Sequence, residues 1–335
     1  MDDVTISIAD TFDLIVNILV RNNTSQVNAR HVAKALVSAE MSGQRGHGLS
    51  RVPSYAAQSA SGKVDGHATP IVVDKKNAAV RIDAVNGFAY PAMNLAVTEL
   101  TALANGAGIA VATVFRSHHF GQAGYHVERL AKNGLVGLVF GNSPQAIAPW
   151  GGSSGIFGTN PIAFAAPRAN NVPLLIDMSL SKVARGKVML AQQKGEPIPE
   201  GWALDSSGHS TTDPDAALNG TMLPMGDAKG AALVMMVEIL AAGLSGAHFG
   251  YEATSFFTAK GRSPGVGQLM LAFNPEFLSG GSFSQRLEEM ISEILTQQGV
   301  RLPGTQRTEL HEKAQREGLS ISGQLMGDLN KLNHD

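Results

Sequence analysis

The sequence contains no cysteine and few charged residues. Without cysteine the chain cannot form disulfides, thiolate zinc sites, iron–sulfur clusters or a cysteine nucleophile. Asp, Glu, Lys and Arg together make up 16% of the residues, and the formal net charge is −2. A nucleic-acid-binding protein normally has a basic excess or clustered Lys and Arg, so we expect no nucleic-acid partner.

Long apolar runs are also missing. The most apolar window, residues 231–244, is interrupted by Glu238 and is shorter than the roughly 20 residues of a transmembrane helix. The N-terminal residues show no positively charged stretch followed by an apolar run, which is the pattern of a secretory signal. We therefore expect no membrane partner and a cytoplasmic location.

Common nucleotide-binding motifs are absent as well. The chain has no G-x-x-x-x-G-K-[ST] motif, and a partial match to G-x-G-x-x-G, Gly106-Ala107-Gly108, lies after a predicted helix and before a predicted strand. The Rossmann turn needs the opposite order, because the N-terminus of its helix faces the pyrophosphate. If this chain binds a dinucleotide, it does so without the common Rossmann turn.

The spacing of apolar residues predicts an α/β protein in which helices from both chain ends form one layer. Two nearly all-apolar segments, 109–115 and 135–140, are typical of strands buried on both faces of a sheet. Segments 157–167 and 173–178 predict a hairpin, and the polar stretch 195–215 predicts a long loop over a site. The other expected elements are strands at 71–73, 78–84 and within 265–274, and helices within 1–60 and at 91–105, 124–132, 282–298, 309–317 and 321–332.

A polar loop near the N-terminus offers candidate catalytic residues. Gly46 and Gly48 flank His47, and Arg51 follows four residues later, which on a helical turn places both side chains on one face. Histidine exchanges protons near neutral pH, and arginine binds a carboxylate through two parallel hydrogen bonds. Together they suit reduction of a 2-oxo acid, whose oxygen needs a proton and whose carboxylate needs an anchor. Alternatively, His47 caps a helix end and Arg51 is a solvated surface charge.

Three glycine-containing loops, 141–144, 151–152 and 158–161, would allow a ligand to approach the backbone, although ordinary turns explain each one singly. Lys229 lies at a predicted helix start, where a cation is unfavourable unless an anion such as phosphate binds there. His118 and His119 are consecutive and point to opposite sides of extended backbone, and no carboxylate lies nearby at ligand spacing. We therefore expect no metal site.

Seven short motifs, taken in order, span nearly the whole chain and resemble the type-2 malate/L-lactate dehydrogenase family. Its members include sulfolactate, ureidoglycolate and 2,3-diketogulonate dehydrogenases and the pyrroline- and piperideine-2-carboxylate reductases. The motifs are Arg45-Gly46-His47-Gly48 with Arg51, Ser117-His118-His119-Phe120-Gly121-x-Ala123-Gly124, Gly158-Thr159-Asn160-Pro161, Asp177-Met178, Ala184-Arg185-Gly186-Lys187, Leu223-Pro224-Met225-Gly226 with Lys229-Gly230, and Leu302-Pro303-Gly304.

The resemblance implies an α/β nicotinamide-binding fold that is not Rossmann, with a mixed, largely antiparallel central sheet and a helical layer formed by both termini. It also implies a homodimer with the active site near the subunit interface. On this basis we expect a helical substrate and dimerisation domain at 1–70 plus about 275–335, and a cofactor-binding sheet domain at about 71–274.

The resemblance also implies roles for individual residues. His47 would be the catalytic acid and base, and Arg51, Thr159, Arg185 and Gly186 would bind a small carboxylate substrate. The cofactor would be NADP or NAD. The residues expected to bind it are His118, His119, Phe120, Gly121, Gln122, Asp177, Met178, Ser179, Ala228, Lys229, Pro303, Gly304 and Arg307.

Two positions depart from the pattern of the cyclic-imine reductases in this family. Those enzymes resemble this chain but carry a serine before the histidine and an aspartate after the Arg-Gly pair, where this chain has Gly46 and Lys187. The departures favour an NAD(P)H-dependent oxidoreductase that interconverts a small 2-oxo acid and its 2-hydroxy acid. The alternatives are reduction of a cyclic 2-imino acid to proline or pipecolate, and a non-catalytic small-molecule-binding protein on the same scaffold.

Overall fold

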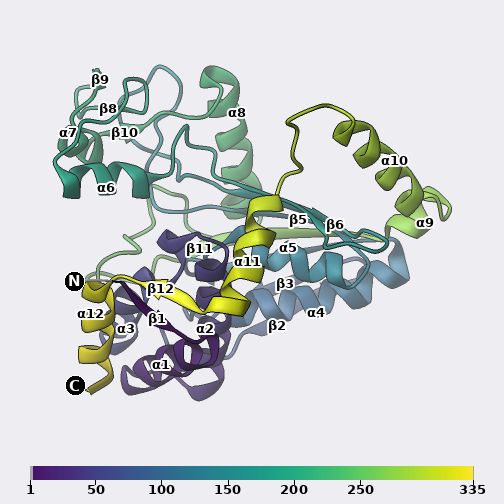
Figure 1. Cartoon of the computed structure of the whole chain (residues 1–335), viewed down its shortest axis with the longest axis horizontal. Coiled ribbons are helices and arrows are strands. Elements are labelled where there is room, and N and C mark those ends of the chain that lie inside the picture. The colour runs from purple at the N-terminus through teal and green to yellow at the C-terminus, as the bar shows by residue number, and fades with distance from the viewer. Residues whose placement is uncertain (1–2, 335) are drawn as a thin grey trace.

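A mixed seven-stranded sheet occupies the centre of the computed structural model, which describes residues 3–334 (Figure 1). The strand order is β2-β3-β4-β11-β5-β6-β7, and only β3 and β4 pair in parallel. The late strand β11 lies between β4 and β5, and the expected hairpin is confirmed in β6 and β7. The strands are β2 (Ile71–Lys76), β3 (Ala79–Asp83), β4 (Ile109–Ser117), β5 (Val136–Gly141), β6 (Ile162–Ala166), β7 (Leu174–Met178) and β11 (Val266–Phe273).

Two helices, α4 (Ala89–Ala107) and α5 (Ala123–Lys132), cover one face of the sheet. The buried residues of α4 include Ala92, Ala96, Leu100 and Ala104, at the four-residue spacing that places side chains on one side of a helix, and three of these four are alanine. Small residues allow the helix axis to lie close to the strands. The helix ends at Gly108, whose positive φ of 82° favours glycine.

A smaller lobe packs on the opposite face of the sheet. Its core joins Leu269 of β11 to Val234 and Val237 of α8. Residues 195–215, expected to form a long loop, instead contain β8 and β9 and the start of α7, so that expectation was wrong in part. The lobe consists of α6 (Arg185–Lys194), β8 (Ala203–Leu204), β9 (Ser210–Thr211), α7 (Pro214–Asn219), β10 (Thr221–Met222) and α8 (Asp227–Glu238), which continues as the π-helix η3 (Ile239–Gly243).

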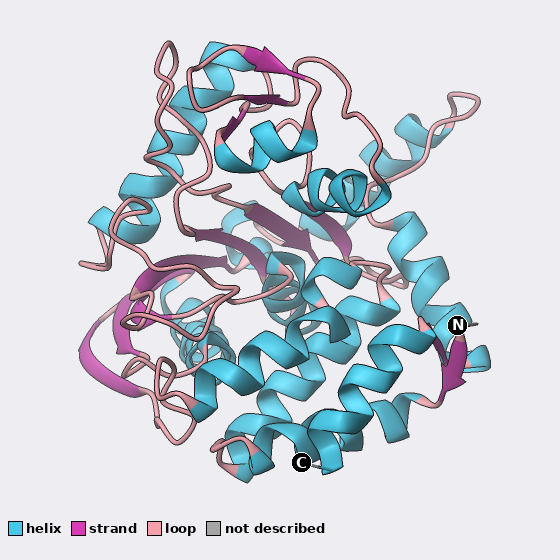
Figure 2. Cartoon of the chain, turned by 90° about the vertical axis from the view of Figure 1, so that its left-hand side faces the viewer, coloured by secondary structure: helices cyan, strands magenta, loops and turns pink. Residues whose placement is uncertain are grey.

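The two ends of the chain meet in a helical layer below the sheet (Figures 1 and 2). β1 (Val4–Ile6) pairs with β12 (Leu319–Ile321) in an antiparallel ribbon, and the helices pack around one core. Ser7 and Ser25 cap the first two helices by accepting the N–H groups of Asp10 and Asn28. The helices are α1 (Ile8–Arg21), α2 (Gln26–Met41), α3 (Val52–Ala60), α11 (Thr305–Glu317) and α12 (Gly323–His334).

The helices α9 (Pro275–Ser279) and α10 (Phe283–Leu295) project from the far end of the sheet (Figure 1). Leu287 and Ile291 of α10 pack against Ala166 of β6 and so belong to a fourth, small core. Within residues 3–334, no helix has the length and apolar character to cross a membrane.

Candidate active site

The segment that carries His47 folds into two single-turn 3-10 helices, η1 (Arg45–His47) and η2 (Leu49–Arg51), which lead into α3. Gly48 joins them and lies against α2, since a Cβ at this position would come within 2.1 Å of Glu40 Oε2. The same carboxylate oxygen accepts the Leu49 N–H at 2.9 Å. Burial raises the pKa of Glu40 above its usual value. Glycine and a buried carboxylate therefore fix the loop that presents His47.

His47 lies beside His119, which follows β4. The Nδ1 of His47 and the Nε2 of His119 are 3.2 Å apart, at hydrogen-bond distance, and the two rings stack. Burial, followed by the nearby Arg51 charge, lowers the pKa of His47 to about 4, and burial holds the pKa of His119 well below 6.5. Both imidazoles are therefore neutral at pH 7 in the free protein.

Two buried tyrosines extend this pair into the core. Tyr55 Oη lies 2.5 Å from His119 Nδ1 and 3.1 Å from Tyr90 Oη. Burial raises the pKa of Tyr55 to about 12, and burial also raises the pKa of Tyr90 well above its usual value. The four polar side chains form a continuous hydrogen-bonded chain that runs from the core to the half-buried ring of His47.

Arg51 lies next to this chain and is held at one end only. Its Nε donates to the Gly46 carbonyl at 2.6 Å, and the Phe257 ring lies 4.4 Å from the guanidinium carbon. Among residues 3–334, its buried Nη1 has no hydrogen-bond partner. A buried cationic donor without an acceptor is suited to binding an anion.

The loop that carries Phe257 is fixed by α3 and by the lysine that follows it. Gln58 Nε2 donates to the Phe256 carbonyl at 2.9 Å, and Lys63 Nζ donates to the carbonyls of Ser255 and Thr258. Gln58 Oε1 lies 3.0 Å from Nε2 of His118, which is fully buried. The His118 side chain thus contacts the support of this loop, and the rings of His118 and His119 both pack against Tyr55 and Phe256, so the expectation that they point to opposite sides was wrong.

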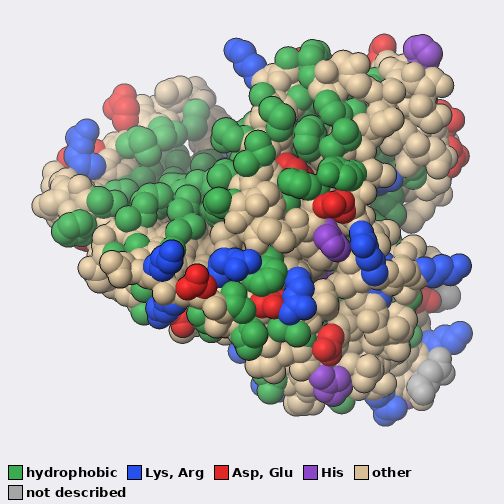
Figure 3. All heavy atoms as spheres, turned by 180° about the vertical axis from the view of Figure 1, so that it is seen from behind, with side chains coloured by type: hydrophobic (Ala, Val, Ile, Leu, Met, Phe, Trp, Pro, Cys, Tyr) green, Lys and Arg blue, Asp and Glu red, His purple; other side chains and the backbone are tan. Residues whose placement is uncertain are grey.

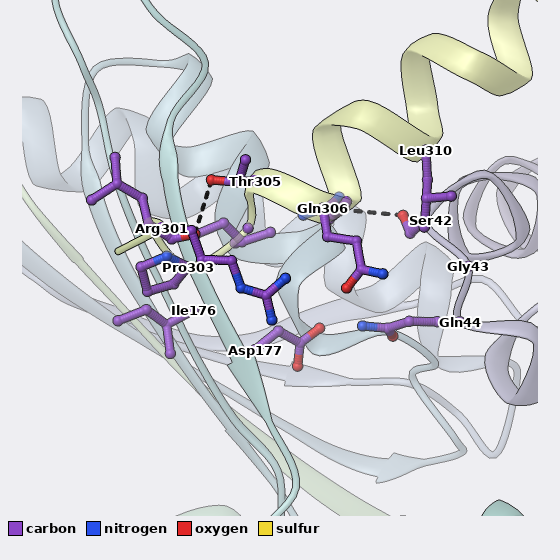
Figure 4. A pocket seen from close by; sticks show the side chains of 14 residues that line it. Ser42, Gly43, Gln44, Ile176, Asp177, Arg301, Pro303, Thr305, Gln306 and Leu310 are labelled. Atoms are coloured by element: carbon purple, nitrogen blue, oxygen red, sulfur yellow. Dashed lines mark hydrogen bonds between the residues drawn. The ribbon is translucent and has the colours of Figure 1, made fainter. Parts of the chain in front are cut away.

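Four of the expected cofactor residues line one cavity of about 450 Å³ between β7, the start of α11 and the end of α2. In Figure 4 the side chains of Gln44, Asp177, Arg301 and Gln306 point toward one another in this space. Among the described residues, Arg301 makes no hydrogen bond or salt bridge. The cavity is lined by Ser42, Gly43, Gln44, Leu175, Ile176, Asp177, Arg301, Leu302, Pro303, Gly304, Thr305, Gln306, Arg307 and Leu310.

Two of these lining residues are held in place by neighbouring helices. Asp177 accepts the Gly124 N–H at 2.8 Å, and a Cβ at Gly124 would press on the same carboxylate. Burial raises the pKa of Asp177. Arg307 donates to Glu128 at 2.7 Å and to Ser42 at 3.2 Å, so it ties α11 to α5 and α2.

A buried glutamate organises the glycine-containing loops behind Thr159. Glu238 accepts hydrogen bonds from the side chains of Asn142 and Asn160 and from the Gly250 N–H, at 2.7–2.8 Å. Burial raises its pKa. Thr159 is the neighbour of Asn160, so Glu238 fixes the backbone on which Thr159 lies.

The remaining expected residues lie at the edge of the smaller lobe. Arg185 donates to the Leu218 carbonyl at 3.0 Å, while Gly186 and Lys187 are exposed in the first turn of α6. Ala228 and Lys229 are exposed in the first turn of α8, where the N-cap Gly226 offers no side-chain acceptor. These residues are joined to the His47 group by no hydrogen bond among residues 3–334.

Several residues of the site escaped the sequence analysis, namely Gln44, Tyr55, Gln58, Tyr90 and Glu238. For two of them a signal existed, because Arg51, Tyr55 and Gln58 are spaced i, i+4 and i+7, which is one face of a helix. Tyr90 and Glu238 reach the site from distant segments, so no local pattern marks them. Within the described part of the chain no three potential ligand side chains gather as a metal site would require.

A histidine pair beside an incompletely paired arginine, next to a polar cavity in an α/β fold, defines the class of a small-molecule enzyme with acid–base chemistry. Residues 6–330 match the family model described as malate/L-lactate dehydrogenase. The chain therefore belongs to the malate/L-lactate dehydrogenase family and is an oxidoreductase.

Individual relatives agree with this assignment. The chain is 51% identical to a (2R)-3-sulfolactate dehydrogenase (NADP(+)) of Chromohalobacter salexigens, over 92% of each chain. It is 42% identical to a Delta(1)-pyrroline-2-carboxylate/Delta(1)-piperideine-2-carboxylate reductase of Pseudomonas putida, over 95% of this chain and 94% of the relative. Among solved structures, a Δ1-piperideine-2-carboxylate reductase of Pseudomonas syringae pvar. tomato superposes with a TM-score of 0.93 at 39% identity, covering 98% of this chain and 99% of that one.

Proposed function

We propose that the protein is an NAD(P)H-dependent oxidoreductase that interconverts a small 2-oxo acid and its 2-hydroxy acid, of the malate, lactate or 3-sulfolactate type. The observation that carries this proposal is the unpartnered Nη1 of Arg51 beside the His47–His119 pair. A substrate carboxylate supplies the acceptor that this guanidinium lacks, and binding there fixes the 2-oxo group in front of His47.

In this proposal each residue of the site has a separate role in binding or protonating the substrate. Arg51 binds the carboxylate, and His47 gives a proton from Nε2 to the oxygen on C2. Thr159 and the Arg185-Gly186 pair close the far side of the substrate pocket. Phe257, which lies over Arg51, excludes water from the ion pair and so strengthens it.

The residues of the cavity fit a nicotinamide dinucleotide. Arg301 has no ion-pair partner among residues 3–334, and no side chain caps the backbone N–H groups at the start of α11, where Gly304 is the N-cap, as phosphate binding requires. Residues 118–122 and 177–179, Ala228, Lys229, Pro303 and Arg307 complete the proposed binding surface. The coenzyme, when bound, supplies the hydride. A relative that is named for NADP(+) supports NADPH as the coenzyme.

The sheet supports a mode of coenzyme binding outside the Rossmann arrangement. A Rossmann site needs consecutive parallel βαβ units, whereas β3 and β4 are the single parallel pair in this sheet. We propose a sheet domain and a helical layer with boundaries near residues 70 and 275, and a coenzyme site at their junction, because the cavity is lined by Asp177 of the sheet domain and by Gln44 and Arg301 of the helical layer.

A homodimer is the second part of the proposal. Hydrophobic side chains gather in a broad region on one face of the molecule (Figure 3). Met235 and Met236 of α8, Ile239 of η3 and Leu244 directly after η3 are exposed hydrophobic residues close together in the sequence. An exposed apolar surface of this kind is typical of an association site.

Reduction of cyclic 2-imino acids is the second candidate function, and relatives with 42% identity and below support it. The imine reductases resemble this chain but carry a serine where Gly46 stands here. A Cβ at Gly46 meets nothing within 4 Å, so packing does not dictate the glycine. The choice of glycine therefore favours the 2-oxo acid.

The test is a substrate panel with NADH and NADPH, followed through the absorbance of the reduced coenzyme. We expect oxidation of NADPH with oxaloacetate, pyruvate, sulfopyruvate or glyoxylate, and little with pyrroline- or piperideine-2-carboxylate. His47→Ala should lower kcat about a hundredfold or more while coenzyme still binds, and the exposed control His67→Ala should not. If the wild type reduces the cyclic imines and none of the oxo acids, the second candidate function replaces this proposal.

A further inference from the structure

Because His47 is neutral in the free protein, a proton that it gives to the substrate must be replaced by one from a neighbouring group. A neutral imidazole holds a single proton, and giving it up leaves an anion unless another proton arrives at the second ring nitrogen. Nδ1 of His47 faces His119 at 3.2 Å, and His119 in turn faces Tyr55 at 2.5 Å. Each group can therefore receive a proton on one side as it releases one on the other.

The buried end of this hydrogen-bonded chain, at Tyr90, determines which group is the donor in each of its hydrogen bonds. The Tyr90 hydroxyl is buried, and among residues 3–334 its single hydrogen-bond partner is Tyr55. If Tyr55 donated to Tyr90, the hydrogen of Tyr90 would be buried without an acceptor, which is unfavourable. Tyr90 therefore donates to Tyr55, and Tyr55 donates its own hydrogen to Nδ1 of His119.

This direction fixes both histidine tautomers. With Nδ1 of His119 accepting, its proton lies on Nε2 and is donated to Nδ1 of His47. The proton of neutral His47 then lies on Nε2, the atom that has no partner among the described residues. The arrangement thus presents a proton donor to the substrate side of the ring without a positively charged imidazole.

We propose that Tyr55, His119 and His47 form a proton relay that delivers a proton to the substrate oxygen, with Tyr90 as the positioning residue that sets its direction. This inference rests on the proposed function. As hydride reaches C2, a new O–H bond forms with the proton from Nε2 of His47. Nδ1 of His47 takes the Nε2 proton of His119, and Nδ1 of His119 takes the phenolic proton of Tyr55.

The phenolate left on Tyr55 is stabilised by the hydrogen bond from Tyr90 and by the charge of Arg51. After product release, solvent protonates His47, which is half-buried and not fully enclosed. Solvent restores the proton on Nε2 of His47, the Nδ1 proton of His47 returns to Nε2 of His119, and the Nδ1 proton of His119 returns to Tyr55, which becomes neutral again. One proton from water is consumed in each reduction, as the overall reaction requires.

The first experiment needs no activity. In wild-type protein labelled with ¹⁵N-histidine, the shifts of Nδ1 and Nε2 report the tautomer of each neutral ring. We expect His47 and His119 both to carry the proton on Nε2. Protonation of His119 on Nδ1 in the free protein would overturn the proposed direction. This measurement uses the native chain, so it does not depend on whether a variant folds.

The second experiment compares three tyrosine-to-phenylalanine variants. Tyr55→Phe should lower kcat roughly tenfold or more with little change in the KM of the oxo acid, and Tyr90→Phe should lower it by less. Tyr125→Phe is the matched control, since this half-buried tyrosine packs on His126 outside the relay. Fewer protons should be transferred in the rate-limiting step of Tyr55→Phe. The solvent isotope effect on kcat, measured in D2O, should therefore be smaller than in the wild type.

The outcomes separate the relay from the function on which it rests. If the wild type is active and Tyr55→Phe keeps its kcat and isotope effect, the relay is wrong while the proposed function stands. If the wild type reduces no substrate, the proposed function is wrong, and the ¹⁵N tautomers alone decide the direction of the hydrogen bonds. Thermal unfolding of each variant identifies any loss of activity that comes from loss of fold.

Discussion

The guanidinium of Arg51 is hydrogen-bonded through one nitrogen, while another nitrogen remains available to a ligand. Its Nε is bound to Gly46, and its Nη1 is buried without an acceptor. We predict that Arg51→Lys raises the KM of the substrate about tenfold or more with a smaller effect on kcat, because an ammonium cannot form the two-pronged contact. Arg45→Lys, an exposed neighbour, is the control. An unchanged KM in Arg51→Lys would remove this residue from the substrate pocket.

A second residue-scale prediction concerns stability and pH. His126 is buried between aromatic rings, and burial lowers its pKa to about 4. The unfolded chain binds a proton at His126 near pH 6.5 and the folded chain does not. Stability is therefore complete above that pH and falls with acidification toward pH 4. His47 and His118 act in the same direction.

We therefore expect the free energy of unfolding, measured with urea, to fall between pH 7 and pH 5. In His126→Gln, which cannot titrate, the fall should be smaller by about 1–2 kcal/mol. An identical pH dependence in variant and wild type would show that His126 titrates alike in the folded and unfolded states.

At the scale of elements, Glu238 connects α8 to three loops by accepting hydrogen bonds only. Glu238→Gln places an amide N–H₂ against donors, so we predict a loss of about 1–3 kcal/mol in unfolding free energy. Glu293→Gln, at an exposed position of α10, should leave stability unchanged. Equal stability of the two variants would contradict the role given to Glu238. Activity should fall with stability, because the loop of Thr159 is held by the same carboxylate.

The sequence predicted those elements whose apolar pattern is long. The helices α1 to α5, the buried strands β4 and β5 and the hairpin β6–β7 follow directly from periodicity. The strands β1, β8, β9, β10 and β12 have two or three residues and depend on pairing with partners distant in sequence, so no local pattern marks them. The same limit applies to the site: the spacing of His47 and Arg51 is local, whereas the contact with His119 is made by folding.

At the scale of the whole molecule, the placement of β11 between β4 and β5 was beyond local prediction, since it requires a late strand to insert into an earlier sheet.

The proposed homodimer can be tested directly by measuring the mass of the particle in solution. We expect sedimentation to give a particle of twice the 35.1 kDa chain mass. Ile239→Lys, on the exposed apolar surface, should shift this particle toward the single chain, and Lys75→Glu, on the edge strand, should not. A monomeric wild type would contradict the proposed homodimer.

The pairing of β1 with β12 has a consequence for the order in which this enzyme becomes active. Asp3 and Ser320 are in contact although they are 317 positions apart. The same core holds α2 and α3, on either side of the loop of His47 and Arg51, together with residues of α12. A ribosome must therefore release β12 and α12 before the helices on either side of the His47 loop can complete their core. Nascent chains should complete the central sheet only after β11 has emerged, and should acquire activity only after β12 has emerged.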